Sequence, residues 1–307
     1  MDIRELKDTV ASSVMWVFSV FVLSLVFFMV GGLFFKAKPI FAIQNIGQLI
    51  FTSVWHPSGG KFGMGGFILG SFWVTAIAMI IAIPLSLLTA IYISEYAHRK
   101  VRRLAKSGID LLAGISPVIY GVWGVIVIVP FVRDQLMPFF SRKMPFFPFA
   151  SDNYTGFSAL AGGIVLAVMS FPVMIMIEME VIASVPLEMR EASLALGATK
   201  WQTIKCVVLQ KAWPGIIAAV ILGLSRAFGE TMAVLMVAGC ALGVFTRSVF
   251  DPAYPLPALI ANTYGEMMSI PLYDSAILLA ALALLIVTIC FTAAGRGLLY
   301  CVENRSM

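Results

Sequence analysis

Six uninterrupted apolar runs, each long enough to cross a lipid bilayer, constrain this chain more than any other feature of its sequence. A transmembrane helix needs about 20 consecutive apolar residues. None of the runs alternates with a period of two, so the pattern excludes a β-barrel and predicts six transmembrane helices in an all-α membrane protein. The predicted spans cover residues 13–35, 67–94, 109–131, 158–182, 214–239 and 275–300.

The composition agrees with a membrane protein and disfavours other classes. Apolar residues make up 60% of the chain and charged residues 12%, against about 45–50% and about 25% in a soluble domain. We expect a single transmembrane domain over residues 1–307, with its core at 67–300. The net charge of +5 does not indicate nucleic-acid binding, because the basic residues lie in short loops and form no continuous stripe. Two histidines and four cysteines without CxxC spacing predict neither a metal site nor a disulfide framework.

The distribution of lysine and arginine predicts the orientation of the chain. Connections on one side of the six spans carry roughly twice as many of these residues as those on the other side. The basic side faces the cytoplasm in bacterial inner membranes, so we predict a multi-pass protein of the cytoplasmic (inner) membrane with both termini in the cytoplasm. The densest cluster, His98–Lys106, is interpreted as a topology anchor, with a lipid or partner site as the alternative.

A patterned connection at 186–210 joins the fourth and fifth spans on the predicted cytoplasmic side. Residues 187–196 are mostly strong helix formers, and Gly197 is predicted to end that helix in a left-handed turn. A second helix is expected from Thr199, with one apolar face formed by Trp201, Ile204 and Val208. Such a helix pair either packs under its own bundle or presents its apolar face to a partner.

The residues of this connection resemble the EAA loop of ABC importer permeases. The family pattern is Glu-Ala-Ala, three residues, Gly, nine residues and Ile-x-Leu-Pro, and this chain has Glu191-Ala192-Ser193, Gly197 and Val207-Val208-Leu209-Gln210 at the same spacing. In that family the loop docks as a coupling helix on a separate ATPase subunit. The resemblance implies a coupling role for Glu191, Ala192, Gly197, Trp201, Val207 and Leu209.

The chain contains no G-x-x-x-x-G-K-[ST] motif, so it has no P-loop to hold nucleotide phosphates. We therefore expect a transport subunit that is not an enzyme and carries no cofactor. If ATP drives transport, ATP-Mg binds and is hydrolysed on a partner ATPase.

Two charged residues, Arg226 and Glu230, lie inside the predicted fifth span. They are four residues apart, so a continuous helix would place them on one face as an ion pair. A charge at mid-bilayer costs about 2.5–3.5 kcal/mol on insertion scales, which favours a functional role over a packing pair. A guanidinium matches the geometry of tetrahedral oxyanions, and the hydroxyls of Ser225 and Thr231 add polar groups nearby. The sequence thus predicts an anion path at these four residues.

A second resemblance concerns the same span. The segment 222–234, Leu-Gly-Leu-Ser-Arg-Ala-Phe-Gly-Glu-Thr-Met-Ala-Val, resembles the fifth-span signature of the PstC-type permease of phosphate importers, and residues 115–124 resemble its third span. The resemblance implies a type I ABC importer permease fold and import of inorganic phosphate. It also implies a second, PstA-like permease, two cytoplasmic ATPase subunits and an external phosphate-binding protein as partners, besides membrane lipid.

The sequence leaves three alternative functions open. A permease for another oxyanion, such as molybdate, sulfate or phosphonate, would also carry an EAA loop. A secondary anion transporter or channel would need no docking loop. An intramembrane enzyme is disfavoured, because the chain has no H-E-x-x-H motif and neither histidine lies in a predicted span.

Overall fold

The computed structural model describes residues 3–143, 147–149, 151, 153–243, 245–265 and 272–306. The first part of the chain contains α1 (Ile3–Phe41), α2 (Ile46–Phe51), β1 (Trp55–His56), η1 (Pro57–Gly59), β2 (Lys61–Phe62), α3 (Gly65–Ile91), η2 (Tyr92–Tyr96), α4 (Arg99–Ala113), α5 (Pro117–Trp123), η3 (Gly124–Ile128), α6 (Val129–Phe131), η4 (Val132–Leu136) and α7 (Met137–Lys143). The second part contains α8 (Ala159–Ala183), α9 (Leu187–Ala195), α10 (Lys200–Thr203), η5 (Ile204–Val208), α11 (Leu209–Phe228), α12 (Met232–Val237), α13 (Leu256–Thr263) and α14 (Tyr273–Ser306).

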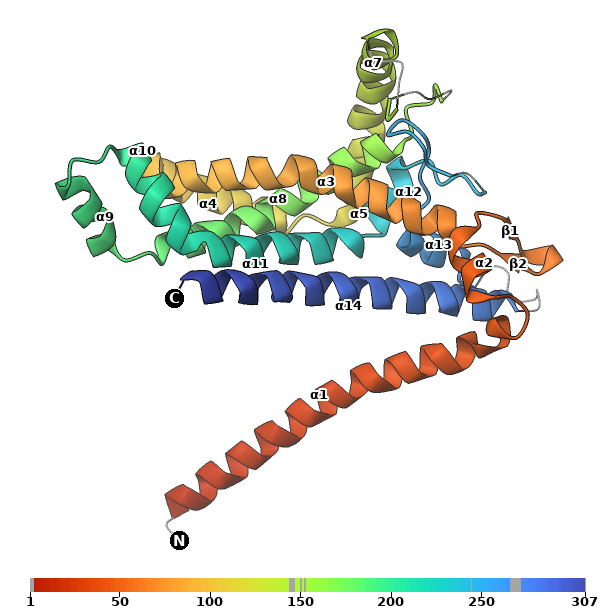
Figure 1. Ribbon diagram of the computed structural model, residues 1–307, viewed down its shortest axis with the longest axis horizontal. Helices are drawn as coiled ribbons and strands as arrows, with labels where there is room; N and C mark the ends of the chain where they lie inside the picture. The colour runs from red at the N-terminus through yellow and green to blue at the C-terminus, as the bar shows by residue number, and fades with distance from the viewer. Residues whose placement is uncertain are drawn as a thin grey trace.

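In the described part of the chain, six helices are long and apolar enough to cross a membrane, as the sequence predicts. In Figure 1, α3, α8, α11 and α14 run side by side, with α9 and α10 at one end of the bundle and α7 and α13 toward the other. Both chain termini lie at the same end as α9 and α10. The spans are Val10–Phe41, Gly65–Tyr96, Pro117–Phe140, Ala159–Ala183, Lys200–Phe228 and Tyr273–Gly297.

Helices α3 and α8 form the centre of the bundle, because glycines let their backbones approach closely. A Cβ atom on Gly163 of α8 would lie 2.5 Å from the side chain of Ile77 on α3, so only glycine fits there. A large apolar cluster joins α3 and α8 to α5 and α12. Two further clusters lie around α13 and α14, and around η5.

The third span differs from the predicted run of 109–131. Residues 99–113 form a separate helix, α4, and the third span begins only at Pro117. Proline lacks a backbone N–H and is favoured in the first turn of a helix, where no partner for that group is needed, and Pro117 occupies this position in α5. The basic cluster His98–Lys106 thus lies mostly on a helix and not in the loop that the sequence suggested.

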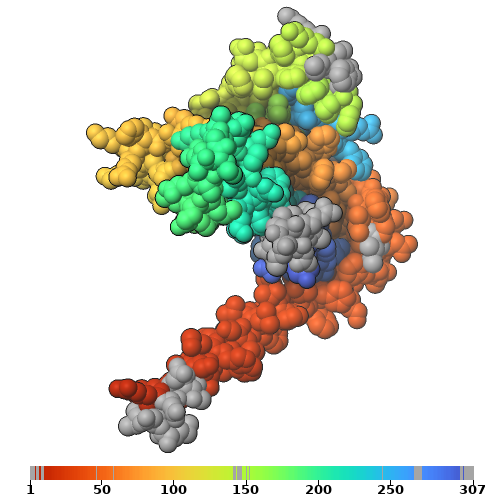
Figure 2. Space-filling view, turned by 60° about the vertical axis from the view of Figure 1, so that its left-hand side comes forward, coloured from red at the N-terminus to blue at the C-terminus, as the bar shows by residue number. Residues whose placement is uncertain are grey.

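Helix α1 diverges from the bundle along most of its length (Figures 1 and 2). Only its last turns are anchored, through Ala37 and Ile40 in the apolar cluster that includes residues of α14. Large apolar side chains such as Phe27 and Phe28 are exposed. This length of α1 therefore presents an apolar surface to whatever surrounds the chain.

Candidate functional site

The fifth span ends at Phe228, so the predicted continuous helix over 214–239 is wrong. Helix α11 stops there, and a new helix, α12, begins at Met232. The carboxylate of Glu230 accepts the backbone N–H groups of Met232 at 3.2 Å and Ala233 at 3.4 Å. Since this side chain satisfies free N–H groups at the start of α12, it supports a new helix in place of a continued one.

The predicted ion pair between Arg226 and Glu230 does not form. In the part of the chain that the structure describes, the ion pairs are Arg133–Asp134 and Arg190–Glu95. The helix break moves Glu230 off the face of α11 that carries Arg226. Arg226 is exposed.

The other two predicted path residues have separate surroundings. The hydroxyl of Ser225 lies 3.3 Å from that of Thr292, so Ser225 faces α14. The hydroxyl of Thr231 donates weakly to the carbonyl of Gly229 at 3.4 Å, inside the helix break. The structure therefore groups Glu230 and Thr231 at the break, leaves Arg226 exposed one turn away, and directs Ser225 to another helix.

Sequence reasoning missed two hydroxyls on α3 that border the helix break. Ser71 and Thr75 are buried and line a narrow cleft together with Glu230 and Pro255. The hydroxyl of Ser71 accepts the backbone N–H of Leu256 at 2.8 Å and donates to the carbonyl of Phe67 at 3.0 Å. A signal was present, because two hydroxyl residues four apart in an apolar run share a helix face.

The predicted helix–turn–helix between the fourth and fifth spans is confirmed. Helix α9 covers Leu187–Ala195, and Gly197 has the left-handed backbone (φ +84°) that glycine favours. The side chain of Thr199 accepts the N–H of Gln202, and that of Gln202 accepts the N–H of Thr199, a capping box at the start of α10.

The predicted apolar face of Trp201, Ile204 and Val208 is divided by the fold. Ile204 and Val208 are each 1% exposed and pack into the bundle, whereas Trp201 is 50% exposed. Trp201 lies on the short helix α10, whereas Ile204 and Val208 are the first and last residues of the π-helical turn η5 that follows it. The interpretation that this face packs under its own bundle is therefore right for Ile204 and Val208 and wrong for Trp201.

An exposed apolar surface remains on the connection. It is formed by Leu187, Leu194 and Leu196 of α9 and its C-terminal turn, together with Trp201. Glu191, Ala192 and Gly197 are also exposed, whereas Val207 and Leu209 are half-buried. Of the predicted coupling residues, the structure thus brings Glu191, Ala192, Gly197 and Trp201 to the outside.

Glu95, at the end of the second span, holds the connection in place. Its carboxylate pairs with Arg190 of α9 at 3.2 Å, and its backbone carbonyl accepts a hydrogen bond from the Lys200 ammonium at 2.5 Å. The same ammonium lies 4.7 Å from the centre of the Tyr96 ring, and Arg190 also donates to the carbonyl of Ile182 at 2.7 Å. Both helices of the connection are therefore tied to the end of the second span.

The described residues contain no group of three or more His, Cys, Asp or Glu side chains that could hold a metal ion. The arrangement leaves an exposed guanidinium at Arg226 without a carboxylate partner among the described residues, and it joins the connection to the second span through Glu95 and Arg190.

Comparisons with known proteins give a consistent family. Residues 82–305 match the model described as "Binding-protein-dependent transport system inner membrane component". A "Probable phosphate transport system permease protein PstC" of Methanocaldococcus jannaschii is 35% identical over 92% of this chain and 91% of its own length. The "Phosphate transport system permease protein PstC" of Xylella fastidiosa (strain 9a5c) is 37% identical over 84% and 80%.

One relative has a less specific name, and the solved structures support the fold alone. The "Probable ABC transporter permease protein YqgH" of Bacillus subtilis is 38% identical over 82% of this chain and 79% of its own length. A chain from the inward-facing MetNI methionine ABC transporter superposes with a TM-score of 0.54, at 20% identity, over 83% of this chain and 96% of that one.

Proposed function

Because this chain belongs to the family of binding-protein-dependent transport system inner membrane components, we propose that it forms one half of the inorganic phosphate path of an ATP-driven importer. The chain is a multi-pass permease of the inner membrane, a transport subunit and not a catalytic one.

The observation that carries the substrate proposal is the state of Arg226. It is an exposed guanidinium in a membrane-spanning helix, and it has no carboxylate partner among the described residues. An unpaired charge at that depth is stable only beside water or beside another protein, as in a water-filled path. A guanidinium fork binds the oxygens of a tetrahedral oxyanion in pairs, and the PstC names of two relatives supply the oxyanion, phosphate.

The helix break supplies the remaining polar groups of the proposed path. Glu230 holds the start of α12, so its role differs from the expected one of pairing with Arg226 between turnovers. Thr231 lies in the break, and Ser71 lines the cleft beside Glu230. Ser225 stays in the proposal as a polar group one residue from Arg226, although its hydroxyl faces Thr292. A path with one strong cation and several hydroxyls binds phosphate weakly enough to release it.

Coupling to ATP takes place in this proposal through the connection at 186–210. Glu191, Ala192, Gly197 and Trp201 contact a partner ATPase that holds ATP-Mg, while the half-buried Val207 and Leu209 keep the second helix seated. The exposed apolar surface of α9 supports this role, because such surfaces on soluble loops mark interaction sites. Movement of the connection reaches the second span through Glu95.

The proposed assembly contains a second, PstA-like permease, two ATPase subunits and an external phosphate-binding protein. This chain contributes one transmembrane domain over residues 1–307, with its core at 67–300, in a type I importer fold with both termini in the cytoplasm. The common position of both termini and α9 at one end of the bundle supports that orientation (Figure 1). The apolar surface of α1 supports contact with lipid or with the second permease.

Phosphate uptake into vesicles reconstituted with the complete importer tests the proposal. We expect Arg226→Ala to lower ATP-dependent uptake about tenfold or more, the effect of one lost charge-assisted contact, while ATP hydrolysis persists. Arg226→Lys should retain part of the uptake, and Arg99→Ala, an exposed arginine outside the spans, should retain all of it. Wild-type uptake without ATP would indicate a secondary transporter. Transport of another oxyanion in place of phosphate would leave the fold proposal intact and overturn the substrate.

A further inference from the structure

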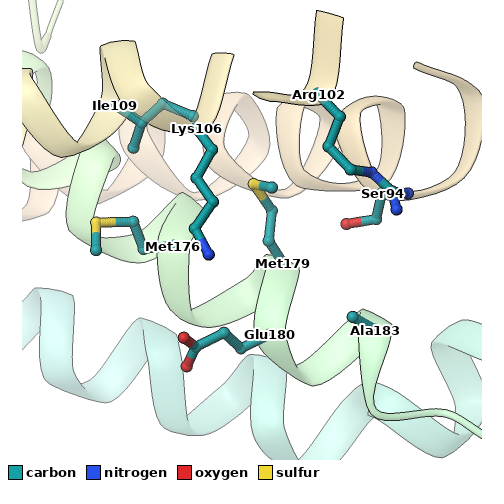
Figure 3. A pocket seen from close by; sticks show the side chains of 8 residues that line it. All are labelled: Ser94, Arg102, Lys106, Ile109, Met176, Met179, Glu180 and Ala183. Carbon is teal, nitrogen blue, oxygen red and sulfur yellow. The ribbon is translucent and has the colours of Figure 1, made fainter. Parts of the chain in front are cut away.

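A cavity of about 180 Å³ lies between α4, the end of the second span and α8, away from Arg226 and the helix break. Figure 3 shows Lys106 and Arg102 reaching into it from α4, with Glu180 on the facing helix. The wall is completed by Ser94, Ile109, Met176, Met179 and Ala183. The cavity thus combines two cations, one carboxylate and an apolar wall.

The charged groups of this cavity are not matched to one another. Lys106 makes no hydrogen bond or ion pair among the described residues, and Glu180 across the cavity makes none with its side chain either. Arg102 donates through Nε to the carbonyl of Ile93 at 2.9 Å, which fixes its guanidinium beside Ser94 and leaves the outer nitrogens for another acceptor. Three charged side chains therefore border one space without satisfying each other.

The helix that carries the two cations has the composition of a membrane-surface helix. Val101, Leu104 and Leu111 of α4 are exposed apolar residues, and Arg99, Lys100 and Arg103 are exposed basic ones. Helices of this kind lie at the boundary between headgroups and acyl chains. In Figure 2, α4 projects from the side of the bundle near the 186–210 connection.

We propose that this cavity binds a membrane phospholipid whose headgroup carries both a phosphate and a primary ammonium, as in phosphatidylethanolamine. Lys106 and Arg102 bind the phosphate, Glu180 accepts hydrogen bonds from the ammonium, and Met176, Met179 and Ile109 contact the glycerol and the first methylenes. A purely anionic headgroup would face repulsion from Glu180. Inorganic phosphate would leave the apolar wall exposed and Glu180 without a partner. This lipid site does not depend on which substrate the permease transports.

The bound lipid would contact both elements that hold the 186–210 connection. Ser94 precedes Glu95, which pairs with α9, and Ala183 ends α8 three residues before the connection begins. A lipid in the cavity therefore fixes the end of the second span relative to the end of the fourth.

Native mass spectrometry of the delipidated importer, assembled from full-length chains in detergent, tests the proposal with three lipids of equal acyl chains. We expect phosphatidylethanolamine to bind about tenfold more tightly than phosphatidylcholine, whose trimethylated ammonium cannot donate a hydrogen bond, and more tightly than phosphatidylglycerol. Lys106→Gln should lower binding of phosphatidylethanolamine by a similar factor. Glu180→Gln should remove the discrimination between phosphatidylethanolamine and phosphatidylcholine. Lys100→Gln, an exposed residue on the same helix outside the cavity, is the matched control.

Several outcomes overturn the proposal. Equal binding of the three lipids, a preference for phosphatidylglycerol, or unchanged binding in Lys106→Gln would each contradict it. Displacement of the lipid by millimolar inorganic phosphate would identify the cavity as a free-anion site. The intact mass of the assembly in the same spectra shows whether each variant folds. Loss of the substrate proposal at Arg226 would leave every one of these measurements unaffected.

Discussion

At Glu230 a single carboxylate does the work of a helix cap. It accepts the N–H groups of Met232 and Ala233, and this local contact replaces the predicted ion pair with Arg226. In the proposed function, the consequence is that Arg226 keeps no carboxylate partner among the described residues and binds the anion. The capping role and the charge of Glu230 can be separated experimentally, because a glutamine keeps the accepting oxygen and loses the charge.

We predict that Glu230→Ala lowers the free energy of unfolding by about 1 kcal/mol through loss of the cap, whereas Glu230→Gln leaves it nearly unchanged. Thermal unfolding of the purified protein in detergent measures the difference. Uptake by the glutamine variant then reports on the charge alone. Equal stability of both variants and the wild type would mean that the contact with α12 contributes nothing.

A second residue-scale prediction concerns Gly197. Apart from its two chain neighbours, no described residue has a heavy atom within 4 Å of a Cβ built at Gly197, so the cost of a side chain comes from the left-handed backbone. We expect Gly197→Ala to strain the turn by about 1–2 kcal/mol and to reduce ATPase-coupled uptake. Gly197→Asn should have a milder effect, since asparagine tolerates this conformation. Matching uptake in both variants would argue against the turn as the sensitive point.

At the scale of elements, the connection between α8 and α11 is a two-helix unit that is fixed by contacts with the end of the second span. Its first helix buries none of its residues, and its second is seated by Ile204 and Val208. What fixes the first helix is the partly buried pair Arg190–Glu95, with exposed fractions of 20% and 10%. The exposed pair Arg133–Asp134, with 51% and 53%, offers a natural comparison within the same molecule.

We predict that Glu95→Gln lowers uptake several-fold at unchanged ATP hydrolysis, because it removes the ion pair that ties α9 to the second span. Its free energy of unfolding should fall by about 1–2 kcal/mol, since the half-buried Arg190 loses its charged partner. Asp134→Asn should change stability by less than about 0.5 kcal/mol, as exposed pairs do. Similar effects of the two substitutions on coupled uptake would contradict the role of Glu95.

At the scale of the whole molecule, the spans that follow α1 pack around α3 and α8, and α1 diverges from them along most of its length. Both termini and the 186–210 connection lie at one end (Figure 1). The cysteines report on this arrangement. Cys206 is exposed on the connection, whereas burial raises the pKa of the Cys240 thiol to about 12. A raised pKa keeps that thiol protonated and unreactive throughout the neutral range.

We predict that a membrane-impermeant maleimide labels Cys206 in inside-out vesicles and not in right-side-out vesicles, in a variant with Cys290 and Cys301 replaced by serine. Cys240 should stay unlabelled in both preparations at neutral pH. Labelling of Cys206 from the outer side alone would invert the proposed orientation. Detergent-solubilised protein serves as the control for accessibility.

The sequence by itself determined the number of spans, the helix–turn–helix and its left-handed glycine. These follow from local requirements, because a span must satisfy its own backbone and a turn must suit its own residues. Only the tertiary structure decided where the fifth span ends and which residues of the apolar face of Trp201, Ile204 and Val208 are exposed. It also decided that Glu95 pairs with Arg190. Those outcomes depend on competition between side-chain and backbone hydrogen bonds and on contacts between residues far apart in the chain. The cavity beside Lys106 belongs to the same group, since no periodicity in α4 or α8 alone indicates that their charged faces meet.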